Sequence, residues 1–167
     1  MNAAIHVLRV LKKEQQPNLT GLDYIEDQLY FLDRCNFQRG STAINIVFAN
    51  SNHFIVLFKR ETEVEIYNSL NQTSFNQETQ QQLQRLLPDV HKINIPSVQH
   101  QGEANYCGML AVAFAIELVV KQDPTNIYFD PAMLRKHFLT ILQNRVAYPF
   151  PKITQQLIRT KNTQMTI

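Results

Sequence analysis

The sequence predicts a single α+β domain in which a short mixed β-sheet is packed by helices. Three observations predict this fold class. Amphipathic helical spacing marks the start of the chain, short strand patterns follow between residues 42 and 98, and further helical patterns begin near residue 107. A length of 167 residues suits one domain and is enough to bury a hydrophobic core.

The first helix is expected over residues 1–13, where apolar residues recur with the spacing of an amphipathic helix. Pro17 and Gly21 are typical of the turn that would end it. Residues 22–32 carry a weaker signal, and we expect a helix or an irregular segment there.

Short segments with apolar alternation, or with an apolar run, predict the strands of the sheet. They are residues 42–50, 52–60, 64–69 and 91–98. The second of these is almost entirely apolar and is therefore expected at the centre of the sheet. A helix with leucines on one face is expected at residues 75–88, between the third and fourth strands.

Two helices are expected in the last third of the chain. Residues 107–120 are apolar on nearly every side, which is typical of a helix buried within a domain. The last helix, over residues 129–142, begins with a capping Asp130 and with Pro131 at its first position. We expect the domain to span residues 1–151 and the polar residues 152–167 to form a C-terminal tail.

Composition excludes several classes of function. A net charge of +2 is too small to indicate nucleic acid as the main partner, and no stretch is apolar enough to span a membrane. The N-terminus does not resemble a secretory signal, so the two cysteines are expected as free thiols in a nuclear or cytoplasmic protein. The five histidines and two cysteines lack metal-ligand spacing, so we expect no metal. We also expect no cofactor, and we expect the protein to be a monomer.

Cys107 and Gly108 stand at the start of the apolar helix, and two interpretations of the cysteine are open. A cysteine beside such a helix is most often a small buried packing residue, and taken alone Cys107 favours this interpretation. It could instead be a nucleophile, because the N–H groups and the dipole of a helix N-terminus stabilise a thiolate. Gly108 would then let a substrate approach closely.

Three polar residues add weight to the second interpretation. His53 begins one expected strand and Asn68 ends the next, so a hairpin would bring both side chains to the same end of the sheet. Asn68 could accept the imidazole N–H and leave the other ring nitrogen for a thiol. Gln101, six residues before Cys107, could donate to an oxyanion. Singly, each has a simpler explanation as a strand-end, turn or solvated residue.

As an ordered set, "HF", "YNSL" and "VQHQGEANYCGMLAVAFA" resemble the ubiquitin-like-protein-specific cysteine proteases, the SUMO-protease and adenovirus-protease-like group. In that family the order is His, then Asp, Asn or Glu, then Gln, then Cys. The resemblance covers roughly residues 2–151. The segment 119–142 is similar to the corresponding segment of such domains in mobile-element-derived proteins.

The resemblance implies a papain-like fold with the histidine-first order, and a role for each residue. Cys107 would be the nucleophile and His53 the general base. Asn68 would orient His53, and Gln101 would form the oxyanion hole together with the Cys107 N–H. The implied reaction is cleavage of a peptide or isopeptide bond after the C-terminal Gly-Gly of a ubiquitin-like protein such as SUMO, which would be the partner of this chain.

The resemblance also implies substrate contacts, and here the sequence departs from the family pattern. Phe54 stands where a tryptophan usually covers the Gly-Gly tail, and Tyr106 stands where an aspartate usually precedes the cysteine. With Gly108 these residues would contact the substrate. Asn68 stands where aspartate is more usual. The "W-L-x-D" stretch that commonly precedes the first helix is absent, so the N-terminal edge of the domain is expected to be incomplete.

Three functions follow as alternatives. The first is an active thiol protease. The second is a catalytically weakened or inactive protease-like domain that binds a ubiquitin-like protein or another protein. The third is an acyltransferase that uses the same cysteine and histidine chemistry, although no feature of the sequence indicates its cofactor site.

Overall fold

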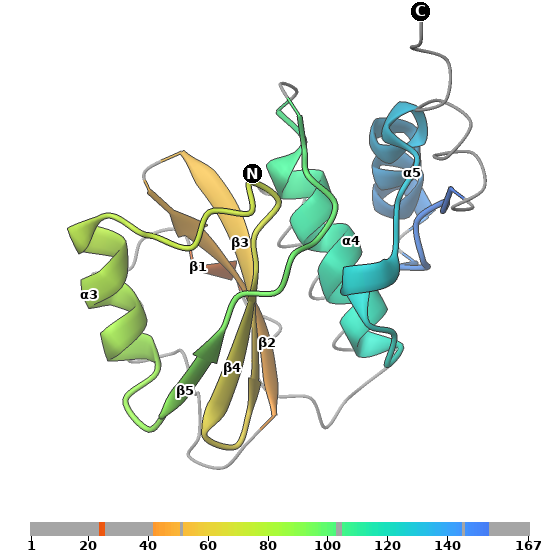
Figure 1. Cartoon of the computed structure of the whole chain (residues 1–167). Helices are drawn as coiled ribbons and strands as arrows, with labels where there is room; N and C mark the ends of the chain where they lie inside the picture. The colour runs from red at the N-terminus through yellow and green to blue at the C-terminus, as the bar shows by residue number, and fades with distance from the viewer. Residues whose placement is uncertain (1–23, 26–41, 51, 103–104, 145, 154–167) are drawn as a thin grey trace, which may run out of the picture.

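A five-stranded sheet lies between helices in the structure, which is a computed structural model (Figure 1). The described residues are 24–25, 42–50, 52–102, 105–144 and 146–153. The helix expected over residues 1–13, the thiol of Cys35 and the tail after residue 153 lie outside them.

The strands follow one another across the sheet in chain order. They are β1 (Tyr24–Ile25), β2 (Ala43–Ala49), β3 (His53–Arg60), β4 (Glu63–Tyr67) and β5 (Lys92–Asn94). The two inner pairings, β2 with β3 and β3 with β4, are antiparallel, and the outer pairings are parallel. The sheet is therefore mixed and β3 is central, as the sequence predicts.

β1 lies in a segment where we expect a helix or an irregular conformation. Tyr24 and Ile25 instead pair in parallel with Ile46 and Val47 of β2. A strand of two residues is too short to produce a periodic pattern, so only its pairing with β2 defines it.

One face of the sheet is covered by α3 (Gln77–Leu86) (Figure 1). Asn76 caps this helix, because its side chain accepts a hydrogen bond from the backbone N–H of Thr79. Leu83 and Leu86 are buried in a cluster that also contains apolar side chains of β2, β3 and β4. The leucines of the predicted helix therefore pack against the sheet, as expected.

The other face is covered by α4 (Cys107–Val119). Every residue of this helix from Leu110 to Val119 is buried, which confirms the prediction from its apolar sequence. A short 3₁₀ helix, η2 (Pro124–Asn126), leads to α5 (Pro131–Asn144), which packs against α4. Asp130 caps α5 as predicted, since its Oδ1 accepts from the N–H of Ala132 at 2.9 Å.

The segment that follows α5 is joined to α4 and to the residues before α5. Lys152 Nζ lies 2.8 Å from Oε2 of Glu117, whose side chain is fully buried in α4. Lys152 also forms an antiparallel bridge with Phe129. The chain is therefore attached to the domain at least as far as Ile153, whose N–H donates to the carbonyl of Tyr128.

The described residues contain no helix that is both long and apolar enough to cross a membrane.

The ion pair of Lys152 with Glu117 should contribute measurably to stability. Replacing the lysine by an apolar residue leaves a buried carboxylate without its cation. Because the Lys152 side chain is 42% exposed, solvent screens part of its attraction to Glu117. We expect Lys152→Met to lower the free energy of unfolding by about 1–3 kcal/mol in urea titrations. The matched control is Lys136→Met on the exposed surface of α5, which should change stability by less than about 0.5 kcal/mol. Equal losses of unfolding free energy in the two variants would contradict a stabilising ion pair between Lys152 and Glu117.

Candidate active site

The β3–β4 hairpin joins His53 to Asn68. A two-residue turn, Glu61 and Thr62, connects the strands, so the start of β3 and the end of β4 lie at the same end of the sheet. The His53 ring donates from Nε2 to Oδ1 of Asn68 over 2.8 Å. Both residues are buried, with exposures of 2% and 1%. A polar pair is thus held inside the domain at a strand end.

The surroundings of Asn68 decide which ring nitrogen of His53 carries the proton. The backbone N–H of Leu70 donates to Oδ1 of Asn68, and Nδ2 of Asn68 donates to the carbonyl of Gln72. These two bonds fix the orientation of the amide, since a backbone N–H can only donate and a carbonyl can only accept. Oδ1 must therefore accept from His53, which leaves Nδ1 of the ring with a lone pair that can take up a proton.

Burial sets the charge of the His53 ring. Removal from water lowers the pKa of His53 below its ordinary value of 6.5, and the hydrogen bond with Asn68 raises that pKa only in part. The ring is therefore neutral at neutral pH, which is the form that can act as a base.

Gln101 is held to the same turn as Asn68. The Ser69 hydroxyl donates to Oε1 of Gln101 at 2.9 Å, and the backbone N–H of Gln101 donates to the carbonyl of Ser69 at 2.9 Å. Because its oxygen already accepts from Ser69, the side chain of Gln101 can offer its Nε2 hydrogens to another group. Sequence reasoning did not select Ser69, and its place next to Asn68 in "YNSL" is the signal that could have indicated it.

Cys107 is the first residue of α4 and carries a half-buried free thiol. Tyr106 occupies the N-cap position with no side-chain hydrogen bond to the helix. The first N–H groups of the helix therefore donate no hydrogen bond to the side chain of the cap residue. This is the position in which the sequence places the candidate nucleophile.

Contact between Phe54 and Gly108 joins the sheet part of the site to the helix part. A Cβ on Gly108 would lie 3.5 Å from Cδ2 and 3.7 Å from Cε2 of the Phe54 ring. Phe54 follows His53 and Gly108 follows Cys107, so this contact brings the start of β3 to the start of α4. In the described part of the chain no hydrogen bond links the Cys107 thiol to His53. Such bonds are often longer before a substrate is bound.

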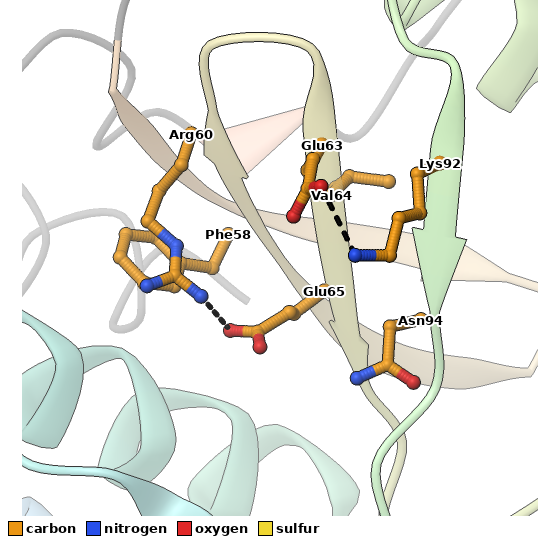
Figure 2. A pocket seen from close by; sticks show the side chains of 7 residues that line it. All are labelled: Phe58, Arg60, Glu63, Val64, Glu65, Lys92 and Asn94. Carbon is orange, nitrogen blue, oxygen red and sulfur yellow. Dashed lines mark hydrogen bonds and ion pairs between the residues drawn. The ribbon is translucent and has the colours of Figure 1, made fainter.

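Two hollows at the far end of the sheet do not share these features. The smaller has a volume of about 60 Å³. Its lining residues are Phe58, Arg60, Glu63, Val64, Glu65, Lys92 and Asn94 (Figure 2). Arg60 pairs with Glu65 and Lys92 pairs with Glu63, each over 3.0 Å. A recess of about 490 Å³ adjoins it, and neither is lined by a cysteine or a histidine. The charged groups of the smaller hollow neutralise one another, and neither hollow offers chemistry comparable with that of His53 and Cys107.

Within the described residues no group of three or more His, Cys, Asp or Glu side chains is placed to hold a metal ion.

The contact between residue 68 and the His53 ring can be tested by titration. Asn68→Asp replaces a neutral acceptor by a carboxylate that stabilises the imidazolium, so the pKa of His53 should rise, whereas Asn68→Ala should lower it. NMR titration of the ring resonances measures both changes. An unchanged pKa of His53 in both variants would show that residue 68 does not contact the ring in solution.

The lowered pKa of His53 also makes the stability of the wild-type protein depend on pH. The folded-state pKa of His53 lies below the unfolded value, so the unfolded chain binds more protons below pH 6.5. The contribution of His53 to the free energy of unfolding is therefore constant above pH 6.5 and decreases as the pH falls through this value.

Comparison with solved structures identifies the fold. No family model matches the sequence, and no curated protein matches it. The Ulp1-like SUMO protease catalytic domain of Chaetomium thermophilum superposes with a TM-score of 0.60 at 16% identity, over 85% of this chain and 69% of that one. The SUMO protease Ulp1 with its catalytic cysteine oxidized to a sulfenic acid gives 0.61 at 10% identity, over 86% and 76%. The C-terminal Ulp1 protease domain in complex with Smt3, the yeast ortholog of SUMO, gives 0.58 at 12% identity, over 85% and 75%. Such low identities establish the fold alone, and this chain has a SUMO-protease-like fold.

Proposed function

We propose that this chain is a thiol protease that cleaves peptide or isopeptide bonds after the C-terminal Gly-Gly of a ubiquitin-like protein such as SUMO. The observation that carries the proposal is the buried hydrogen bond of His53 with Asn68, at a strand end whose Phe54 contacts the start of the Cys107 helix. The SUMO-protease-like fold supports it, and one protein with this fold, Ulp1, forms a complex with the SUMO ortholog Smt3.

The proposed reaction begins with a proton transfer. Nδ1 of His53 takes the proton of the Cys107 thiol, and the thiolate attacks the carbonyl carbon of the scissile bond. The negative charge moves to the carbonyl oxygen, where Nε2 of Gln101 and the backbone N–H of Cys107 donate hydrogen bonds. The protonated His53 then gives its proton to the leaving amine as the C–N bond breaks, which leaves a thioester on Cys107.

Water completes the reaction. His53, neutral again, takes a proton from a water molecule that attacks the thioester carbonyl. The C–S bond breaks and the proton on His53 returns to the sulfur of Cys107, while the carboxylic acid formed on the ubiquitin-like protein loses its remaining proton to solvent and leaves as a carboxylate. Throughout, Asn68 holds the ring in the tautomer that leaves Nδ1 available.

The substrate tail would lie beside Phe54 and the start of α4. A Gly-Gly tail has no side chains, and Gly108 presents none beside the Phe54 ring, so the tail could approach the helix start closely. Tyr106 packs partly buried beside the helix start and would contact the residues that precede the scissile bond.

A binding module without turnover is the second candidate function. Two observations favour it: the amide of Asn68 is a neutral partner for His53, and the Cys107 thiol has no hydrogen bond to the ring in the described part of the chain. Such a domain would bind a ubiquitin-like protein through the same surface, without cleaving it.

Electrophilic probes test the proposal directly. SUMO and ubiquitin that carry a C-terminal vinyl methyl ester should form a covalent adduct with the wild-type chain, detected by mass spectrometry, because the thiolate of Cys107 adds to the vinyl group. Cys107→Ala should lose the adduct, and Cys35→Ser should retain it. If no probe reacts while Cys107→Ala still binds one of the two proteins, the binding-module function is correct and the protease function is wrong.

Gly108→Ala separates passage of the tail from stability. The added Cβ makes only an ordinary contact with Phe54, and alanine favours a helix, so the free energy of unfolding should stay equal or rise by up to about 1 kcal/mol. The methyl group narrows the space beside Phe54, so adduct formation with the SUMO probe should slow. Alkylation by iodoacetamide, a small reagent, serves as the control and should stay unchanged. A variant that reacts with the SUMO probe at the wild-type rate would place the tail elsewhere.

A further inference from the structure

We propose that Gln99, with the help of Asn71, is a positioning residue that holds Gln101 in place for its role in the oxyanion hole. This inference rests on the proposed function, because it deepens the role of Gln101 in the same site. Neither Gln99 nor Asn71 touches the reacting atoms in the proposed reaction. Both act through the backbone of the segment that carries Gln101.

The buried side chain of Gln99 binds one residue twice. Its Oε1 accepts from the backbone N–H of Phe129 at 2.7 Å, and its Nε2 donates to the carbonyl of Phe129 at 3.0 Å. The amide thus replaces the pair of bonds that a neighbouring strand would make. Phe129 is fully buried, and its ring lies between those of Phe114 and Phe150, with centroids 5.9 and 6.2 Å away. Gln99 is therefore anchored to a fixed part of the core.

Asn71 makes the same kind of paired hydrogen bonds to Val98, the residue before Gln99. Its Oδ1 accepts from the N–H of Val98 at 3.0 Å, and its Nδ2 donates to the carbonyl of Val98 at 3.1 Å. Asn71 has a φ of 52°, in the left-handed region that asparagine tolerates, and its own N–H donates to the carbonyl of Asn68. The turn that contains Asn68 is therefore hydrogen-bonded to the segment that carries Gln101 through the side chain of Asn71.

The segment needs these bonds because it has no regular secondary structure. Residues 95–101 form neither helix nor strand. Burial of Val98 in the core, the hydrogen bonds of Asn71 and Gln99, and the two hydrogen bonds between Ser69 and Gln101 hold them in position. Fixing a backbone in one conformation costs about 1–2 kcal/mol per residue, so a side chain that must present Nε2 within a narrow range needs such anchors.

This role differs from a general contribution to stability. Loss of Gln99 should leave the Cys107 thiol and the His53–Asn68 bond intact. The side-chain hydrogen bonds of Gln99 go to the backbone of Phe129 and to none of these residues. Alkylation of Cys107 by iodoacetamide passes through no oxyanion, whereas amide hydrolysis does. The two rates therefore distinguish an effect on Gln101 from an effect on the nucleophile.

The experiment compares Gln99→Leu with Gln82→Leu. Gln82 is a buried glutamine in α3 whose Nε2 has no partner in the described part of the chain, so it is a matched control away from the site. With aminomethylcoumarin amides of SUMO and ubiquitin, Gln101→Ala should lower kcat about 100-fold, as loss of one oxyanion donor does. Gln99→Leu should approach the same loss with KM unchanged, the double variant should lose no more, and the iodoacetamide rate should stay at the wild-type value. Gln82→Leu should leave kcat unchanged.

Hydrogen exchange of the wild type and Gln99→Leu provides a readout that does not depend on activity. The Gln101 N–H, which donates to Ser69, should exchange about tenfold faster in the variant, as should the Phe129 N–H. Faster exchange at Phe129 alone would overturn the inference, as would additive losses of kcat or a slowed alkylation. If the wild type cleaves neither amide but Gln101 exchanges faster in the variant, the proposed protease function fails while the positioning of Gln101 by Gln99 stands.

Discussion

The buried amide of Asn68 is the constraint on which the candidate site depends. A buried side-chain amide is stable only when its donors and acceptors are satisfied, and Asn68 satisfies them with His53, the Leu70 N–H and the Gln72 carbonyl. Together these bonds shape the turn after β4 and select the His53 tautomer. Ser69, the next residue in this turn, makes two hydrogen bonds with Gln101, so one turn holds both the base and the candidate oxyanion donor.

Parts of the chain that are distant in sequence meet at this end of the sheet, because α4 packs lengthwise on its face (Figure 1). The helix is buried from Leu110 to Val119, so its position is determined by packing over most of its length. Its first turn is then carried to the start of β3, where Phe54 meets Gly108. The backbone of a residue on a loop could move independently of the sheet, whereas the backbone of Cys107, at the start of such a helix, is held by the packing of the helix.

The sequence predicts most of the described elements, because burial imposes an apolar run or an apolar periodicity on most of them. The central position of β3, the buried α4 and the Asp130 cap follow from local patterns alone. The two-residue β1 could not be predicted in this way, since its partner strand defines it. Gln99 and Asn71 were missed for a similar reason: each binds a backbone about thirty positions away, and in a glutamine-rich chain Gln99 resembles a solvated side chain.

The neutral partner of His53 changes what the rest of the proposed site must supply. Burial favours the uncharged ring, and an amide stabilises an imidazolium less than a carboxylate does, so the resting imidazole would be neutral. The thiolate would then form only as the proton moves to His53 during attack. Charge appears on the carbonyl oxygen in the same step, and its stabilisation by fixed donors becomes the main electrostatic contribution. A rigid Gln101 matters more in such a site than in one that rests as an ion pair. The hydrogen bonds of the Gln99 and Asn71 side chains would therefore affect the rate of the proposed reaction.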